Sequence, residues 1–389
     1  MTTTSPPPRA RGARLAAMLR GAAAIASDPA NVRWLSGLAG EPHELYGLAP
    51  LHAVVGPDGA VCVVAPASEA AWIEEAGRLD EDVVTQGAFV LRGAPSDALR
   101  TAVGGGRTLA DALALALAHV GAGTDVRIVV DDGVAPSRFA ELAPALAPRE
   151  LAPDPLAFAR ARAVKDADEL DRLRAVNAVA EAAIAAALEI ARPGVTEREL
   201  LRVLRATMVD AGARPLLGSV GIGERGALVD FAARDRRLAP GEAIRLDVGC
   251  VLDGYHADMA RTAVLGPAPD WLREAYDALL AGEQAALDAC RPGATGAQLF
   301  DAAVAVTRAQ GLPDYERSHC GHGIGLSMYE WPRVAPGADE PLEAGMTMCL
   351  ETPLYLIGRA GVQVEDAVVV TGDGCARLGT SDRTLIELS

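Results

Sequence analysis

An internal repeat in the second half of the chain constrains the fold more than any other feature. The segment ALEIARPGVTERELL, from Ala187, aligns without a gap with ALDACRPGATGAQLF, from Ala286. In each copy a helix is predicted to end at Arg-Pro-Gly, and the next begins with the capping-box pattern. The capping pairs are Thr196 with Glu199, and Thr295 with Gln298. Chance similarity between two helix starts is the alternative. A duplicated half-domain, with helices and then strands in each half, predicts a pseudo-twofold axis and a cleft between the halves.

The chain is predicted to have two domains, because 389 residues are too many for one ordinary core. Residues 10–150 alternate apolar runs such as AVCVVA with helical runs such as TLADALALALAHV, which predicts an α/β domain. The segment APRELAPDPLAF is rich in proline and predicts the boundary. A second domain over residues 155–389 then opens with a long helix from about Asp166 to Arg192.

Charge and cysteine usage exclude several classes of partner. The formal charge is −16 and no basic stripe is present, so a nucleic-acid partner is not expected. Six cysteines are scattered without a CxxC pair, which favours reduced thiols and a cytoplasmic location. No apolar run reaches about 18 residues, so a membrane partner is not expected either.

Two aspartates occupy a predicted β-hairpin. AIRLDVG is one strand, Asp253-Gly254 is the turn, and ADMARTAVL is the returning strand. Asp247 and Asp258 therefore lie on facing strands, where an unpaired carboxylate is costly. A position at the rim of the sheet is the alternative for either residue. As a pair, they predict a bound cation.

Three further candidate ligands follow. His322 lies between glycines in GHGIGL, where the backbone can approach another element closely. Glu351 and Glu365 lie in the apolar strands MTMCLETPLYLI and GVQVEDAVVVT, and Asp366 should point to the opposite face from Glu365. Each residue alone could be a satisfied core residue. Together with the aspartates they form an oxygen-rich set with one imidazole. This set suits two divalent ions, with Mn expected and Co, Fe or Zn as alternatives.

These motifs resemble the pita-bread metallopeptidase family, which includes methionine aminopeptidase, aminopeptidase P, prolidase and the metal-free creatinase. DPANVRWLSGL resembles the N-terminal signature of the aminopeptidase P and prolidase branch, and ARAVKDADELDRLR resembles the start of its catalytic domain. DVGCVLDGYHADMART, HGIGL, LET and VEDAVVVT fall where the family has its five ligands. The resemblance implies a creatinase-like α/β N-terminal domain and an α+β pita-bread catalytic domain with an internal pseudo-twofold repeat.

The resemblance also implies a role for each ligand. Asp258 and Glu365 would bridge both ions, Asp247 would chelate one of them, and His322 and Glu351 would complete the other. Glu351 would be the catalytic proton shuttle. It would take a proton from the bridging water and pass it to the leaving amine. Arg333, in EWPR, lies where prolidase-like members have an Arg that binds a substrate carboxylate.

The chain departs from the family pattern at two positions. Asp230 stands where active peptidases have a His seventeen residues before the first Asp ligand, and Tyr329 stands where they have a second His. Both positions are expected to touch substrate. His319 and His256 are close in sequence and could take over the missing role. The alternative is that they are local or outer residues of the site.

Three functions remain open from the sequence. The first is a dinuclear metal-dependent hydrolase resembling Xaa-Pro dipeptidase or aminopeptidase P, which cleaves an amide bond with a metal-bridging hydroxide. The second is a hydrolase or lyase for a non-peptide, amino-acid-like small molecule, with a pocket altered at Asp230 and Tyr329. The third is a non-catalytic homologue, which the complete ligand set disfavours. By resemblance alone, a homodimer is expected.

Overall fold

The computed structural model describes residues 8–38, 40–80, 82–93, 96–229 and 231–389. The candidate residue Asp230 lies outside these ranges. The chain divides into two compact units, Met1–Arg162 and Ala163–Ser389. Helix α8 (Pro155–Ala163) follows the proline-rich segment and ends at this division. Each unit is described by itself below.

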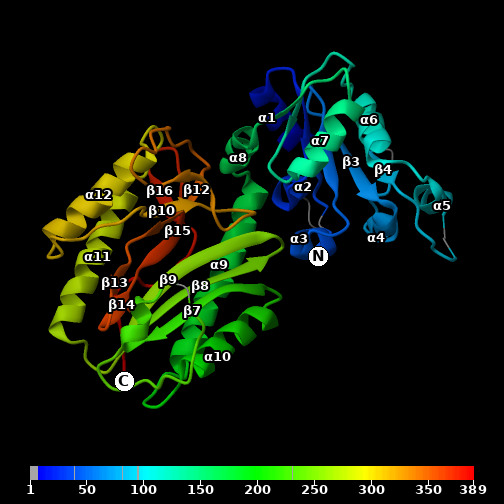
Figure 1. The fold of residues 1–389 in the computed structure, drawn as a ribbon. Coiled ribbons are helices and arrows are strands. Elements are labelled where there is room, and N and C mark those ends of the chain that lie inside the picture. The colour runs from blue at the N-terminus through cyan, green and yellow to red at the C-terminus, as the bar shows by residue number, and fades with distance from the viewer. Residues whose placement is uncertain (1–7, 39, 81, 94–95, 230) are drawn as a thin grey trace. The chain divides into compact units, whose positions relative to one another are not determined.

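The first unit is an α/β domain built, within the described ranges, on one mixed sheet of six strands (Figure 1). The strand order is β4-β3-β2-β1-β5-β6. β1 pairs antiparallel with β2 and parallel with β5, so the sheet mixes a hairpin with crossover connections. The strands are β1 (Ala23–Ala26), β2 (His52–Val55), β3 (Val61–Pro66), β4 (Val83–Gln86), β5 (Ile128–Val130) and β6 (Leu151–Pro153).

Helices cover both faces of this sheet. α6 and α7 bury Leu113, Leu117 and Leu142 against Ile25 and Val64, because alternate strand residues point to one face. α1 and α2 contact β1, β2 and β3. The helices are α1 (Pro8–Leu19), α2 (Pro29–Ser36), α3 (Glu41–Tyr46), η1 (Ala67–Glu69), α4 (Ala70–Glu75), α5 (Asp97–Gly104), α6 (Leu109–His119) and α7 (Pro136–Ala145).

The second unit is built on a sheet that has nine strands in the described part of the chain. Its main path is β11-β10-β12-β15-β9-β8-β7, and β16 and β17 pair with β15 and β9. The strands are β7 (Arg214–Ile222), β8 (Ala243–Leu252), β9 (Tyr255–Leu265), β10 (Gly321–Gly323), β11 (Glu330–Arg333), β12 (Thr347–Glu351), β15 (Glu365–Val370), β16 (Cys375–Arg377) and β17 (Ile386–Leu388). A separate two-stranded ladder joins β13 (Leu354–Leu356) to β14 (Ala360–Val362), and η2 (Gly223–Ala227) packs beside it.

Four helices cover one face of this sheet. α9 (Ala167–Glu189) packs on β8 and β9, α10 (Glu197–Asp210) packs on β7, and α11 (Asp270–Ala289) packs on β12 and on α12 (Gly296–Ala309). On this helix-covered face, Arg261 and Asp366 form a buried ion pair at 2.9 Å. Asp366 therefore points to the helix-covered face and Glu365, its neighbour, points to the opposite face, as predicted.

The internal repeat is confirmed in three dimensions. Both predicted capping boxes form, at Thr196 and Thr295. In the first half, Gly194 N–H donates to Leu238 O and Leu238 N–H to Val195 O, at 2.8 Å each. In the second half, Gly293 and Ala294 make the same two bonds with Leu342, at 2.9 and 2.7 Å. The predicted fold class, α/β followed by a pita-bread domain with internal repeat, is confirmed. Within the described ranges, no helix is long and apolar enough to cross a bilayer.

Candidate metal centre

The hairpin of β8 and β9 carries the two aspartates as predicted. Its turn places Asp253 and Gly254 at φ of 50° and 84°, the left-handed conformations that a tight hairpin turn requires. In the ladder, Asp247 is opposite Ala260, and Asp258 is opposite Gly249. Directly opposite residues of an antiparallel pair share one face. Both carboxylates therefore stand on the face that the helices leave uncovered.

The second half of the repeat extends this row of residues across the sheet. Glu351 of β12 is opposite Glu365 of β15, and Glu365 is opposite Ala260 of β9. The row reads Asp247, Ala260, Glu365, Glu351 across four strands. Asp247 follows Leu238 by nine residues, and Glu351 follows Leu342 by nine residues. The pseudo-twofold repeat thus relates the two ends of the row.

A second row lies beside the first. His322 of β10 is opposite Cys349 of β12, which is opposite Ala367 of β15. Ligand atoms of Asp258, His322, Cys349 and Glu365 all lie within 4.8 Å of one another, and all four residues are buried. The methyl side chains of Ala260 and Ala367 leave room between the polar groups. The structure therefore brings together all five predicted ligands and adds a thiol.

The electrostatics of this cluster call for a cation. Burial, and then the neighbouring carboxylates, raise the pKa of Asp258 and of Glu365 well above their usual values. Asp258 Oδ1 is buried without a hydrogen-bond partner in the described structure. A buried, unpartnered oxygen among like charges is unfavourable unless a cation compensates it. Oxygen donors with one imidazole suit Mn, Co, Fe or Zn, so the residues fit the predicted metal ions.

Glu351 has a different environment from its two carboxylate neighbours. Its Oε1 lies 3.1 Å from His319 Nδ1 and 3.8 Å from Arg317 Nη2, and its Oε2 accepts from Gln363 Nε2 at 3.3 Å. Burial opposes ionisation, but the His319 hydrogen bond and the Arg317 charge lower the pKa of Glu351. Glu351 is thus held in its ionised form.

Arg245 links the other end of the row to the same network. Its guanidinium is fully buried, and Nη1 donates to Asp247 Oδ2 at 3.0 Å and to Gln363 Oε1 at 2.7 Å. Gln363 Nε2 in turn donates to Glu365 Oε2 at 3.2 Å. Arg245 and Gln363 therefore hold the carboxylates in place, and the Arg245 cation offsets part of their charge.

His322 is oriented by its backbone and by an aromatic neighbour. Its Nδ1 lies 2.9 Å from Gly323 O, which leaves Nε2 facing Asp258 Oδ2 at 3.6 Å. Burial lowers the pKa of His322, which favours the neutral ring that a metal needs. A Cβ at Gly321 would lie 2.1 Å from Cys349 O, so only glycine allows this approach of β10 to β12. The Tyr329 ring stacks on His322 with centroids 3.9 Å apart.

Two other predicted residues lie on strands of the same sheet. Arg333 is exposed on β11, opposite His322 in the ladder of β10 and β11, and with Trp331 and Glu340 it lines a surface pocket of about 410 Å³. His256 lies near the start of β9, and its Nδ1 lies 3.3 Å from Gly325 O. Of the two histidines considered as replacements, His319 is the one in contact with Glu351.

Sequence reasoning missed Arg245, Gln363, Cys349 and Arg317. The sequence did contain a signal for the first three, because each stands two residues before a predicted ligand. Arg245 precedes Asp247, Gln363 precedes Glu365, and Cys349 precedes Glu351. Side chains two apart in a strand share a face, so these three had to join the cluster. Arg317 carried no such signal, because it lies in the loop before β10.

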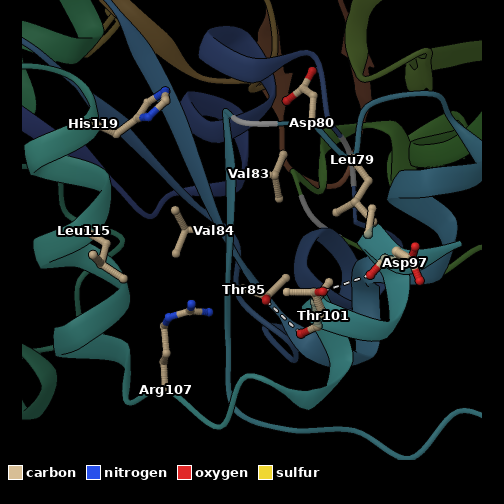
Figure 2. A pocket seen from close by; sticks show the side chains of 12 residues that line it. Leu79, Asp80, Val83, Val84, Thr85, Asp97, Thr101, Arg107, Leu115 and His119 are labelled. Carbon is tan, nitrogen blue, oxygen red and sulfur yellow. Dashed lines mark hydrogen bonds between the residues drawn. The ribbon is translucent and has the colours of Figure 1, made fainter.

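A pocket of the first unit offers no comparable chemistry. It has a volume of about 700 Å³ and lies among β4, α5 and α6 (Figure 2). Several of its polar groups bond within the unit: Thr85 Oγ1 donates to Ala102 O, Thr101 Oγ1 to Asp97 O, and His119 pairs with Asp82. This pocket therefore brings together no set of metal-ligating side chains like that of the second unit.

The fold and the site together define the class: a pita-bread protein with a carboxylate-rich group of possible metal ligands on the open face of its sheet. Residues 171–372 match metallopeptidase family M24, and the chain belongs to this family. The Xaa-Pro dipeptidase of Pyrococcus furiosus is 31% identical over 227 residues, which are 58% of this chain and 65% of that protein. The aligned part is thus less than two thirds of this relative.

Solved structures extend the likeness to the whole chain. Dipeptidase PepE of Mycobacterium ulcerans has 27% identity and a TM-score of 0.80, with 100% of both chains covered. The Xaa-Pro dipeptidase of Bacillus anthracis has a TM-score of 0.81 over 98% of this chain and 100% of that one. Its identity of 23% supports the shared fold alone.

Proposed function

We propose that this chain is a dinuclear metal-dependent hydrolase that cleaves an amide bond in short peptides. One observation carries the proposal: four carboxylates and one imidazole from both halves of the repeat meet on the open face of one sheet. The metal ligands we propose are Asp247, Asp258, His322, Glu351 and Glu365. The names of the dipeptidase relatives support a peptide substrate.

Each residue has a task that its surroundings support. Divalent ions held there would polarise the scissile carbonyl and make a water molecule nucleophilic at neutral pH. Glu351, kept ionised by His319 and Arg317, takes the proton of that water and delivers it to the leaving amine. Arg245 holds Asp247, and Gln363 holds Glu365, so that the ligands keep their positions.

Substrate recognition is assigned to the residues around this row. Arg317 lies beside Glu351 with its guanidinium 5.5 Å from the Tyr355 ring, and His319 lies on the same loop. These groups suit the carboxylate of a short peptide. Tyr329, exposed and stacked on His322, offers a hydroxyl to the oxyanion that forms during hydrolysis.

A second candidate is a non-peptide, amino-acid-like substrate. Tyr329 favours it, because a phenol occupies the place where the sequence pattern of active peptidases has a His, and it stacks on His322. A hydrogen-bond donor to an oxyanion is worth roughly 2.7–4 kcal/mol, so the exchange of this donor would change which substrates react.

The test is a substrate screen with metal-loaded protein. The panel comprises Ala-Pro, Met-Pro and Ala-Leu, together with N-acyl amino acids as non-peptide amides. Glu351→Gln should lower kcat by 100-fold or more, roughly the contribution of a general base. Glu343→Gln, an exposed acid just before β12, is the matched control. If the Glu351→Gln variant keeps the wild-type kcat, Glu351 is not the general base.

The Asp230→His, Tyr329→His double variant separates the two candidates. If wild type is slow on all three dipeptides and the double variant gains activity on Ala-Pro, the non-peptide substrate is favoured. If wild type turns over Ala-Pro or Met-Pro at roughly 1–1000 per second, it is an ordinary peptidase of this kind.

A further inference from the structure

Cys349 is the one member of the buried cluster that the predicted ligand set leaves unused. It stands on β12 between His322 and Ala367, in the row next to the carboxylates. Its Sγ lies in the group whose donor atoms are all within 4.8 Å of one another. The side chain is fully buried, and Sγ donates a weak hydrogen bond to Asp258 O at 3.5 Å.

A second observation at this position points to a ligand. One carboxylate oxygen of Asp258 belongs to the same group, and Asp258 Oδ1 is buried without a hydrogen-bond partner in the described structure. Asp258 itself is 3% exposed. Ala367, next to Cys349 in its row, has only a methyl side chain. Because the donor atoms of this group lie within 4.8 Å of one another, an ion bound by Asp258 would lie close to the Cys349 sulfur as well.

We propose that Cys349 is a thiolate donor to the metal centre, a sulfur ligand added to the oxygen and nitrogen set. On coordination the S–H bond breaks, the sulfur donates the electron pair to the ion, and the proton passes to solvent. A thiolate shifts metal preference toward softer ions such as Zn, Co or Cd and away from Mn. The inference rests on the proposed metal site.

The experiment is a titration of Co(II) into the metal-free full chain, followed by absorption spectroscopy. A thiolate bound to Co(II) gives a charge-transfer band in the near ultraviolet, whereas oxygen and nitrogen ligands alone give weak visible bands. Wild type should show the band, and Cys349→Ser and Cys349→Ala should lose it while they keep the visible bands. The readout requires no turnover.

Cys250→Ser is the matched control. Cys250 is buried in β8 of the same sheet, but it points to the helix-covered face, with Sγ 3.9 Å from Val176 O of α9. This variant should keep the near-ultraviolet band at wild-type intensity. A competition assay adds a second measure: Cys349→Ser should weaken Cd(II) binding by roughly 10–100-fold and Mn(II) binding by less.

The outcomes separate this inference from the proposed function. Visible Co(II) bands without the thiolate band in wild type overturn the sulfur ligand and leave the oxygen and nitrogen site intact. No Co(II) binding at all overturns both. Circular dichroism of each variant checks that the fold is retained, and the Ser and Ala variants together distinguish loss of sulfur from loss of packing.

Discussion

Asp258 is held where a carboxylate alone is unfavourable, since its Oδ1 is buried and its neighbours carry the same charge. A bound cation removes both penalties. At the scale of single residues, the proposed metal centre is therefore a set of carboxylates whose burial is unfavourable for each one alone. Their burial becomes favourable only when a bound cation neutralises them together.

Asp258→Asn should reduce the divalent metal from about two ions per chain to about one, because it removes a charge shared by both. Elemental analysis after Mn or Co loading measures this. Asp253→Asn, in the exposed turn of the same hairpin, is the control and should retain the full amount. Wild-type metal content in Asp258→Asn would show that this residue is no ligand.

His52 makes stability dependent on pH. Burial, with smaller effects of His43 and Arg138, lowers its pKa to about 4, and its Nε2 has no hydrogen-bond partner in the described structure. The unfolded chain binds a proton near pH 6.5, but the folded chain does so only near pH 4. The free energy of unfolding should thus fall by about 3 kcal/mol as pH drops through this window.

Urea denaturation at pH 7 and pH 4.5 measures the effect of His52. His52→Gln should lose less stability between these two pH values than wild type does. His119→Gln, an exposed histidine on α6, is the control and should behave as wild type. Equal pH dependence in wild type and His52→Gln would assign the effect to other groups.

At the scale of elements, one buried ion pair ties the segment before α9 to β11. Lys165 Nζ donates to Glu330 Oε2 at 2.8 Å, and the side chains are 1% and 2% exposed. Lys165 is the only lysine in the chain. Since neither partner reaches water, removal of one leaves a buried charge uncompensated.

Lys165→Met should destabilise the second unit by about 3–5 kcal/mol. The double variant Lys165→Met, Glu330→Gln should cost less, because the neutral amide removes the stranded charge and can still accept from Ser327 N–H. Chemical denaturation of the single and double variants gives the coupling. If the losses in unfolding free energy of the two single variants add up to that of the double variant, Lys165 and Glu330 are not energetically coupled.

At the scale of the whole molecule, metal binding should stabilise one unit selectively. All proposed ligands lie in Ala163–Ser389. At a metal concentration 100 times the Kd, binding adds about 2.7 kcal/mol to the stability of the folded state. Calorimetry with Mn and with a chelator should therefore move the transition of the second unit upward with metal. A shift confined to the first unit would contradict this placement.

The predicted homodimer belongs to the same scale and rests on the family resemblance. Light scattering at micromolar concentration should give about twice the chain mass of 40.1 kDa. The measurement should be made with and without bound metal, so that assembly is not confused with metal loading. A mass of one chain under both conditions would exclude the dimer.

The sequence by itself determined the features that depend on neighbours along the chain. Three features follow from local geometry: the hairpin turn at Asp253-Gly254, the capping boxes at Thr196 and Thr295, and the opposite faces of Glu365 and Asp366. Each depends on residues within a few positions of one another. The repeat could be recognised in the sequence for the same reason, because each half contains the same short helix-end and capping-box pattern.

Only the tertiary structure decided which of these elements meet. His322 lies 64 residues after Asp258, and β12 and β15 stand between their strands β10 and β9, yet its Nε2 reaches within 3.6 Å of that carboxylate. The register of strands from different halves is set by the packing of the whole sheet on its helices, and no short stretch of sequence encodes it. That register also brings Cys349 to the centre and the loop residue Arg317 to Glu351.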